Sequence, residues 1–188
     1  MKTGTFNKKP LDHSKNTKDA YFMDTSQILK NAINAQKLAF CLFPNEQWIS
    51  INKHIFMAAS RAPRSGRQSE ILEQELSQAR ILATLGHTVY LLPEFGPRKT
   101  KHPDAIVDGL IMEFKTVSGN ERKIKEKYKE AREKAENVFL QIDPPFSHRT
   151  VVRKLSGSIR GKGYKSGLIW VYFKHTGKMV YWTVEGLK

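Results

Sequence analysis

Cysteine, acidic residues and long apolar stretches are all scarce in this chain of 188 residues. The single cysteine, Cys41, excludes an intrachain disulfide and a thiolate metal cluster, and because it lies within LAFCLF we expect a buried thiol. No apolar run approaches the ~20 residues of a membrane span. The polar start, MKTGTFNKKPLDHSKN, lacks the apolar core of a signal peptide. We therefore expect no membrane segment and a cytoplasmic protein, unless a route that the sequence does not encode delivers it.

The shortage of acidic residues leaves the chain strongly basic. Against 32 lysines and arginines stand 18 aspartates and glutamates, which gives a formal net charge of +14 and a pI near 9.9. Such an excess favours polyanionic partners, of which nucleic acid is the commonest. There are two alternatives to a nucleic-acid partner. The protein could bind a membrane surface, or its basic charge could be a general property of a proteome rich in charged residues. With 39% hydrophobic and 27% charged residues, the composition is typical of a folded globular protein.

The stretch HPDAIVDGLIMEFKT, residues 102–116, predicts a β-hairpin that brings two carboxylates together. Its Asp-Gly pair at 108–109 is the signal for a type I′ turn, in which both central residues need a positive φ. The turn sets the register, which places Asp104 opposite Glu113, with Lys115 on the same face. The other face is wholly apolar and holds Ala105, Val107, Leu110, Met112 and Phe114.

Directly opposed carboxylates repel each other and destabilise a sheet, so something must compensate for their charge. A divalent cation held by oxygen ligands would do so, with Lys115 beside it, and this arrangement is suited to hydrolysis. Alternatively, Pro103-Asp104 is an ordinary loop dipeptide, and Glu113 and Lys115 form a solvated ion pair. A register slip of one residue would also separate the two carboxylates.

A third carboxylate is predicted to point inward from a helix over residues 70–85, where apolar residues recur at helical spacing. At about 100° per residue, Glu75 falls inside the apolar arc, between Leu72 and Ala79 on one side and Leu82 and Ile71 on the other. A buried carboxylate must be paired, protonated or coordinated, so we expect Glu75 to complete the hairpin site. The alternatives are a side chain that reaches back to water and one that pairs with a buried arginine.

The rest of the chain indicates an α/β fold with a mixed central β-sheet flanked by helices. We divide it into an N-terminal extension, 1–65, which is partly helical with a disordered start, and a core domain, 66–188. A basic linker at 61–69 separates them. The core is predicted as a helix (70–85), three strands (87–95 and the hairpin), a helix (120–137), a strand (138–142), a helix near 148–156, and two strands in 167–184.

The stretch SGSIRGKGYKSG, residues 156–167, is rich in glycine and carries Arg160, Lys162 and Lys165. Its Gly-Lys pair is not followed by Ser or Thr, so it is no nucleotide-binding P-loop. We expect a flexible basic loop whose three cations contact a nucleic-acid backbone. An ordinary solvated connection is the alternative.

The order of Glu75, Pro103-Asp104 and Glu113-Phe114-Lys115 resembles the motif of the PD-(D/E)XK nuclease superfamily, whose core is a helix, a three-stranded meander, a helix and a strand. Residues 70–142 cover this pattern, and residues 1–65 fall outside it. The segments QELSQARILATLGHTVYLLPE and HPDAIVDGLIMEFKTVSG, followed by a charged helix, look more narrowly like the C-terminal tRNA-cleaving domain of contact-dependent growth inhibition toxins. Related domains occur on phages and mobile elements.

The resemblance implies a divalent metal ion, with Mg²⁺ favoured over Mn²⁺ and Zn²⁺. Asp104 and Glu113 would bind it, with the Phe114 carbonyl as a further ligand and Glu75 contributing directly or through water. Lys115 would orient or help deprotonate the attacking water and neutralise charge on the phosphorane. Polarisation of the phosphate by the metal would supply much of the rate.

The function implied by the resemblance is that of a metal-dependent endonuclease, most specifically a tRNA-cleaving toxin RNase that acts in the cytoplasm of a target cell. An acidic immunity protein would then be a further partner. The alternatives are a DNA endonuclease of the same fold from a phage or mobile element, and a nonenzymatic basic module that binds nucleic acid.

Overall fold

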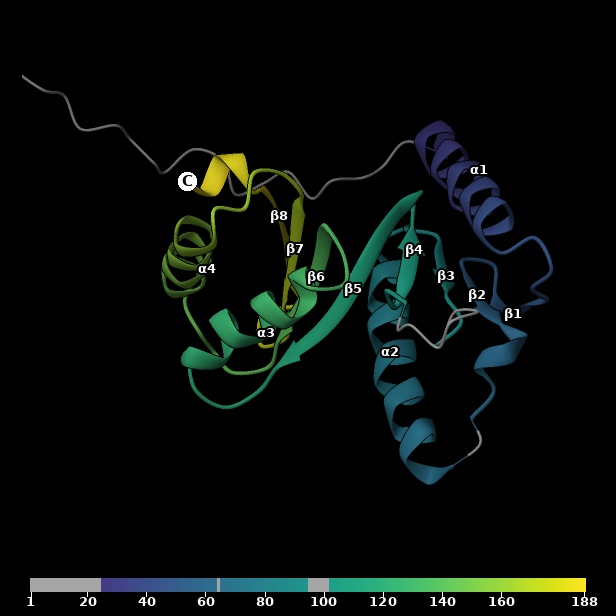
Figure 1. The fold of residues 1–188 in the computed structure, drawn as a ribbon, viewed down its shortest axis with the longest axis horizontal. Coiled ribbons are helices and arrows are strands. Elements are labelled where there is room, and N and C mark those ends of the chain that lie inside the picture. The colour runs from purple at the N-terminus through teal and green to yellow at the C-terminus, as the bar shows by residue number, and fades with distance from the viewer. Residues whose placement is uncertain (1–24, 64, 95–101) are drawn as a thin grey trace, which may run out of the picture.

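Eight strands form one mixed sheet in the computed structural model of the chain, which describes residues 25–63, 65–94 and 102–188. The strands lie in the order β1 to β8, and the pairs β2–β3, β5–β6 and β6–β7 are parallel while the others are antiparallel. Helices flank the sheet (Figure 1), which confirms the predicted α/β class. The elements are α1 (Thr25–Leu42), β1 (Trp48–Asn52), β2 (Ile55–Ala58), α2 (Gly66–Thr84), β3 (Val89–Leu91), β4 (Ala105–Val107), β5 (Leu110–Val117), α3 (Arg122–Arg132), β6 (Asn137–Ile142), α4 (His148–Lys162), β7 (Leu168–Phe173) and β8 (Lys178–Thr183).

From α2 onward, the element order is helix, three strands, helix, strand, helix and two strands, as predicted. Within the part of the chain that the structure describes, no helix is long and apolar enough to span a membrane. The expected disordered start falls within residues 1–24, and most of the basic loop before the hairpin falls within residues 95–101; both ranges lie outside the described residues.

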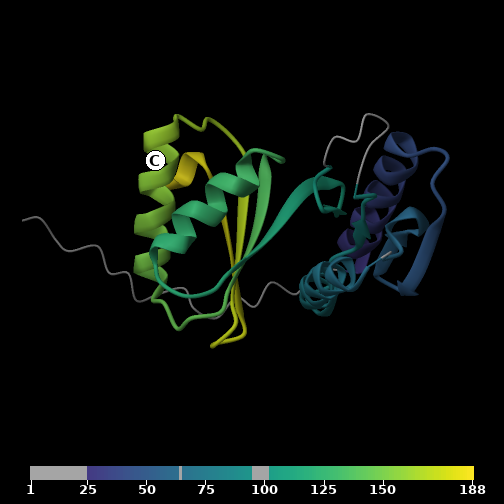
Figure 2. The same ribbon diagram turned by 60° about the horizontal axis from the view of Figure 1, so that its bottom comes forward.

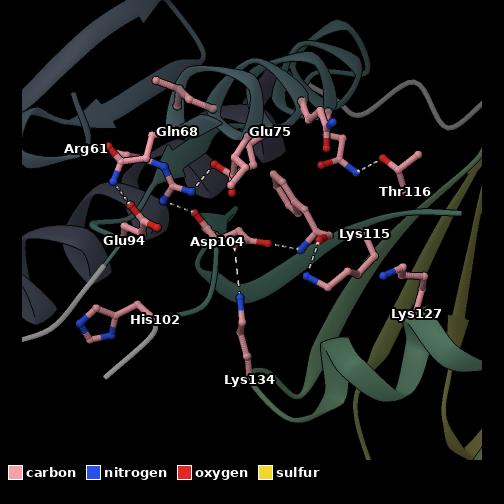
Figure 3. A pocket seen from close by; sticks show the side chains of 15 residues that line it. Arg61, Gln68, Glu75, Glu94, His102, Asp104, Lys115, Thr116, Lys127 and Lys134 are labelled. Carbon is pink, nitrogen blue, oxygen red and sulfur yellow. Dashed lines mark hydrogen bonds and ion pairs between the residues drawn. The ribbon is translucent and has the colours of Figure 1, made fainter. Parts of the chain in front are cut away.

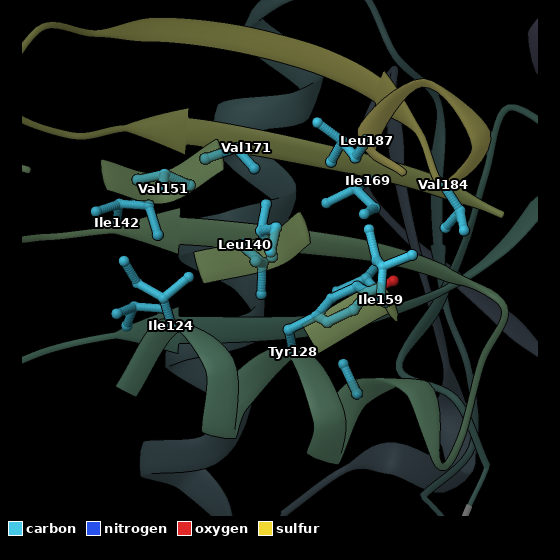
Figure 4. Packing of buried hydrophobic residues seen from close by; sticks show 14 of the residues in the cluster. Ile124, Tyr128, Leu140, Ile142, Val151, Ile159, Ile169, Val171, Val184 and Leu187 are labelled. Atoms are coloured by element: carbon cyan, nitrogen blue, oxygen red, sulfur yellow. The ribbon is translucent and has the colours of Figure 1, made fainter. Parts of the chain in front are cut away.

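The helices cover both faces of the sheet (Figures 1 and 2). On one half, α1 packs against Tyr90 and Ile106, whereas α2 packs against Leu91 and Val107 on the opposite face. On the other half, α3 and α4 enclose a second core with alternate residues of β6 such as Leu140 (Figure 4). The long strand β5 joins the two halves, because its first three residues pair with β4 and its third and later residues pair with β6.

The hairpin of β4 and β5 forms as the sequence predicts. Asp108 and Gly109 have φ angles of 53° and 88°, and Ala105 pairs with Met112, so the predicted turn and register are confirmed. All five residues of the predicted apolar face pack in the core beneath α2. The polar face of the hairpin is therefore turned away from this core.

The Asp108 side chain holds the turn against two other elements. Its carboxylate accepts hydrogen bonds from the Thr88 backbone N–H (2.8 Å) and from Asn31 Nδ2 in α1 (3.1 Å). It also lies 2.6 Å from Nδ1 of the buried His87. These contacts fix the hairpin relative to α1 and to the segment that enters β3.

The predicted linker at 61–69 is wrong, because most of it is ordered as helix. α2 begins at Gly66, and the Ser65 side chain caps it by accepting a hydrogen bond from the Gln68 N–H (3.3 Å). This bond satisfies an N–H that has no partner within the helix. Just upstream, Ala59–Arg61 forms a 3-10 helix in which Arg61 is buried.

The sheet continues across the boundary that we placed between residues 65 and 66, because β2 pairs in parallel with β3. The extension thus contributes α1, β1 and β2 to the same layered structure. Cys41 is exposed, so the prediction of a buried thiol is wrong. α1 buries Ala35 and Ala39 against the sheet, and Cys41 lies off this stripe.

α3 is shorter than predicted. The Asn120 side chain accepts a hydrogen bond from the Arg122 N–H (3.0 Å) at its start, and Ile124 and Tyr128 are buried as expected. The helix ends at Arg132, however, and the chain turns at Lys134 instead of remaining helical to residue 137. This early turn directs Lys134 toward the hairpin.

α4 is longer than predicted and removes most of the expected flexible loop. The helix continues to Lys162 because Leu155 and Ile159 are buried in the core, which outweighs the low helix propensity of Gly157 and Gly161. Gly163, with φ 65°, then ends the helix in the left-handed conformation. Arg160 and Lys162 therefore lie in the last helical turn.

We expect Gly109→Ala to destabilise the protein more than Gly119→Ala. Both glycines have a positive φ, 88° and 82°, which costs an alanine roughly 1–2 kcal/mol. A Cβ at Gly109 would also lie 3.1 Å from Asn34 Cβ, whereas a Cβ at Gly119 would meet no described atom within 4 Å. Urea unfolding of the two variants measures the difference, and an equal loss at both positions would contradict the packing of α1 on the turn.

Candidate active site

A cleft of about 300 Å³ opens beside the start of β4, where β5 is no longer paired with β4 and continues beside β6 (Figure 3). Residues of α2 line one side, and Lys127 and Lys134 from the α3 segment line another. Phe114, Lys115 and Thr116 of β5 lie between them. Pairing with β6 holds this part of β5 in place. Its side chains are accessible from the cleft because β4 pairs with β5 only up to Met112.

Asp104 and Glu113 meet at this split in the sheet. Lys134 Nζ lies 2.6 Å from Glu113 Oε1 and 3.8 Å from Asp104 Oδ1, so both carboxylates are within reach of one cation. The Phe114 N–H donates a hydrogen bond of 2.8 Å to Asp104 Oδ2 and fixes that carboxylate to β5. The structure therefore brings the two acids together, as the hairpin register predicts.

Burial and opposite charge act against each other on this pair. Glu113 is fully buried, and burial, with a further contribution from Asp104, raises the pKa of its carboxyl group, while Lys115 and Lys134 oppose this rise. Burial by itself would lower the pKa of Lys134, but its hydrogen bond to Glu113 and the charge of Asp104 outweigh burial and raise it. The ammonium of Lys134 is thus favoured by the acids that it bridges.

Lys115 contacts the same Glu113 oxygen as Lys134 does. Its Nζ donates to Glu113 Oε1 and to the Phe114 carbonyl oxygen, the latter at 3.1 Å. The carbonyl that the resemblance implies as a metal ligand is therefore already hydrogen-bonded to Lys115. Nearby, Gln78 Nε2 of α2 donates to Thr116 Oγ1 (3.2 Å), which links the helix to β5.

Glu75 lines the cleft from α2 and is 8% exposed, so its predicted burial is confirmed. Its carboxylate forms an ion pair with the buried guanidinium of Arg61, the arrangement that we considered as the alternative for this residue. Arg61 also donates to the carbonyl oxygens of Leu92 and Asp104, the latter at 3.4 Å. Burial raises the pKa of Glu75 to about 7, against the lowering effect of Arg61.

The two carboxylates fit a hard divalent cation. Glu113 Oε2 is buried and has no hydrogen-bond partner among the described residues, which leaves an acceptor free for a metal. Mg²⁺ takes one or two protein carboxylates and keeps several waters, whereas structural Zn²⁺ sites use four nitrogen or sulfur ligands. Residues 25–63, 65–94 and 102–188 hold no group of three or more His, Cys, Asp or Glu side chains placed for a metal. Asp104 and Glu113 therefore suit Mg²⁺ or Mn²⁺ better than Zn²⁺.

The three basic residues predicted to bind nucleic acid do not line the cleft. Arg160 and Lys162 lie in the last turn of α4, and Lys165 follows that helix. The cleft is lined instead by the basic side chains of Arg61, Lys115, Lys127 and Lys134, the last two from α3 and the turn after it. The inward-pointing Glu75 indicated that a buried arginine could be its partner, but no sequence signal identified Arg61 as that arginine, and none marked Lys134.

Comparison with known proteins finds no matching family model, no matching curated protein and no matching solved structure. A function for this chain therefore has to be argued from the side chains of the cleft. Those side chains are two carboxylates, two lysines that contact one of them, and a buried arginine–glutamate pair behind them.

We expect Arg61→Met to destabilise the fold by about 3–5 kcal/mol, because it leaves the buried Glu75 carboxyl without its partner. Adding Glu75→Gln should recover part of this loss. Arg80→Met is the matched control, since Arg80 pairs with Glu73 on the exposed side of the same helix and such pairs contribute about 1 kcal/mol at most. Urea unfolding measures all three variants, and similar losses for the Arg61 and Arg80 variants would show that the buried pair is unimportant.

Proposed function

We propose that the protein is a metal-dependent endonuclease with a PD-(D/E)XK-like core, which hydrolyses phosphodiester bonds in nucleic acid. One observation carries this proposal: Asp104 and Glu113 lie within reach of one cation at a split in the sheet, with Lys115 on the same glutamate oxygen. The order α2, β3, β4, β5, α3, β6 agrees with the core of that superfamily. The net charge of +14 supports a polyanionic substrate.

Each side chain has a distinct part in the proposed reaction. Asp104 and Glu113 would hold the cation, which when bound supplies Lewis acidity toward the phosphodiester and toward water. Lys115 would orient the attacking water and neutralise charge that develops on the phosphoryl oxygens. The Arg61–Glu75 pair positions Asp104, because Arg61 also binds the Asp104 carbonyl oxygen.

Among nucleic acids we favour transfer RNA as the substrate, because of the resemblance of the segments around Glu75 and the hairpin to tRNA-cleaving toxin domains. The same resemblance supports a toxin that acts in a target-cell cytoplasm and an acidic immunity protein as its partner. A DNA endonuclease of the same fold is the second candidate within this chemistry. The two substrates are separated by direct assay.

The first test is incubation with total RNA and with plasmid DNA, each with Mg²⁺, Mn²⁺, Zn²⁺ or EDTA. We expect discrete transfer-RNA fragments with Mg²⁺ or Mn²⁺ and none with EDTA. Asp104→Asn should lower the cleavage rate by roughly 10³-fold, because it weakens metal binding at the reacting phosphate, while nucleic acid still binds. Glu126→Gln, an exposed carboxylate of α3, is the control and should cleave normally. Equal cleavage by the two variants would refute the proposed site.

A second test separates the enzyme from a nonenzymatic binding module. Because Arg160 and Lys162 lie outside the cleft, replacing both with Gln should leave the cleavage rate at saturating substrate unchanged. If both contact phosphates, the slope of log affinity against log salt should fall by about two, as fluorescence anisotropy would show. If the protein is instead a nonenzymatic binding module, the double variant should lose its nucleic-acid-binding function entirely, while Asp104→Asn should keep that function.

A further inference from the structure

Lys134 stands where a cation between the two acids would stand. Its Nζ is 2.6 Å from Glu113 Oε1 and 3.8 Å from Asp104 Oδ1. Lys115 also contacts Glu113 Oε1, so two ammonium groups face two carboxylates. The formal charges of these four ionised side chains sum to zero.

A divalent cation would add two positive charges to this balanced group. Glu113 is fully buried and Asp104 is 8% exposed, so water screens the repulsion between the new charge and the two ammonium groups only weakly. The cation is therefore disfavoured as long as both ammonium groups stay. Either one of them must move away or negative charge must enter the cleft.

Of the two lysines, Lys134 is the one able to leave. Lys115 projects from the middle of β5, where its backbone is paired with Leu140 of β6, and its Nζ also binds the Phe114 carbonyl oxygen. Lys134 lies in the turn between α3 and β6, lines the cleft and is 28% exposed. Its four-carbon stem lets the ammonium move toward a phosphate in the cleft without a change in the fold.

We infer that Lys134 holds the place of the divalent cation and gives it up to a phosphate group of the bound nucleic acid, so that metal and nucleic acid bind cooperatively. This inference rests on the proposed function, because it concerns the same two carboxylates. Linkage makes the coupling reciprocal: nucleic acid raises the affinity for metal by the same factor as metal raises the affinity for nucleic acid. The cleft would then load its metal chiefly when substrate is present.

The test measures Mn²⁺ binding to the full chain by titration calorimetry, alone and with a saturating phosphorothioate oligonucleotide, as RNA and as DNA in separate runs. The heat of Mn²⁺ binding to each oligonucleotide alone is subtracted. For the wild-type chain we expect the oligonucleotide to raise the Mn²⁺ affinity about tenfold, a factor typical of coupled sites. Lys134→Met should bind Mn²⁺ about tenfold more tightly without oligonucleotide and lose most of the coupling.

Lys127→Met is the matched control. Lys127 lines the same cleft and its removal changes the charge equally, but its Nζ binds Glu130 (2.7 Å) and not the two acids. We expect the wild-type affinity and coupling for this variant. Lys134→Arg keeps the charge and should keep the coupling. A thermal melt checks folding, and Lys134→Gln, which can still donate to Glu113, replaces the Met variant if that one does not fold.

Wild-type Mn²⁺ affinity and coupling in a folded Lys134 variant would overturn the inference, as would an equal change in Lys127→Met. These results are separable from those for the proposed function. Cleavage without coupling between metal and oligonucleotide would support the proposed nuclease and refute the exchange at Lys134. Coupling without cleavage of RNA or DNA would support the exchange and refute the nuclease.

Discussion

Burying two carboxylates side by side is possible only if positive charge is held against them, and this requirement organises the cleft. Glu113 is fully buried, and an unpaired charge in such a place is strongly unfavourable. One compensating ammonium comes from Lys115 on the same strand, and the other comes from Lys134 after α3. The core beneath α3, which includes Ile124 and Tyr128, thereby sets the place from which Lys134 reaches the cleft.

The path of β5 creates the place where this charge balance occurs. The strand leaves β4 after three paired residues and continues with β6, so its middle belongs to both halves of the sheet. Asp108 and its partners hold the hairpin turn, which sets which residues face the split. In the proposed reaction, the cation and the phosphate would therefore meet at a junction whose backbone is held by pairing with β4 up to Met112 and with β6 from Met112 onward.

The sequence predicted the core elements from α2 onward because their signals are local. An Asp-Gly turn and alternation of apolar residues determine a hairpin, and helical spacing determined the burial of Glu75. The ends of helices were harder to predict, since α3 stops and α4 continues according to what packs against them. The partner of Glu75 was also hidden, because Arg61 stands in a stretch whose composition favours a linker.

The sequence by itself determined the fold class, the hairpin register and the meeting of Asp104 with Glu113, since each follows from backbone preferences within a short segment. Only the tertiary structure decided which further cations pair with the acids of the cleft: Lys134 with Asp104 and Glu113, and Arg61 with Glu75. Lys134 and Arg61 reach the cleft through the packing of α3 and through the segment before α2, which no local pattern encodes. The charge balance of this buried site depends on residues that are distant along the chain, and the packing of the whole core determines which of them lie close to it in space.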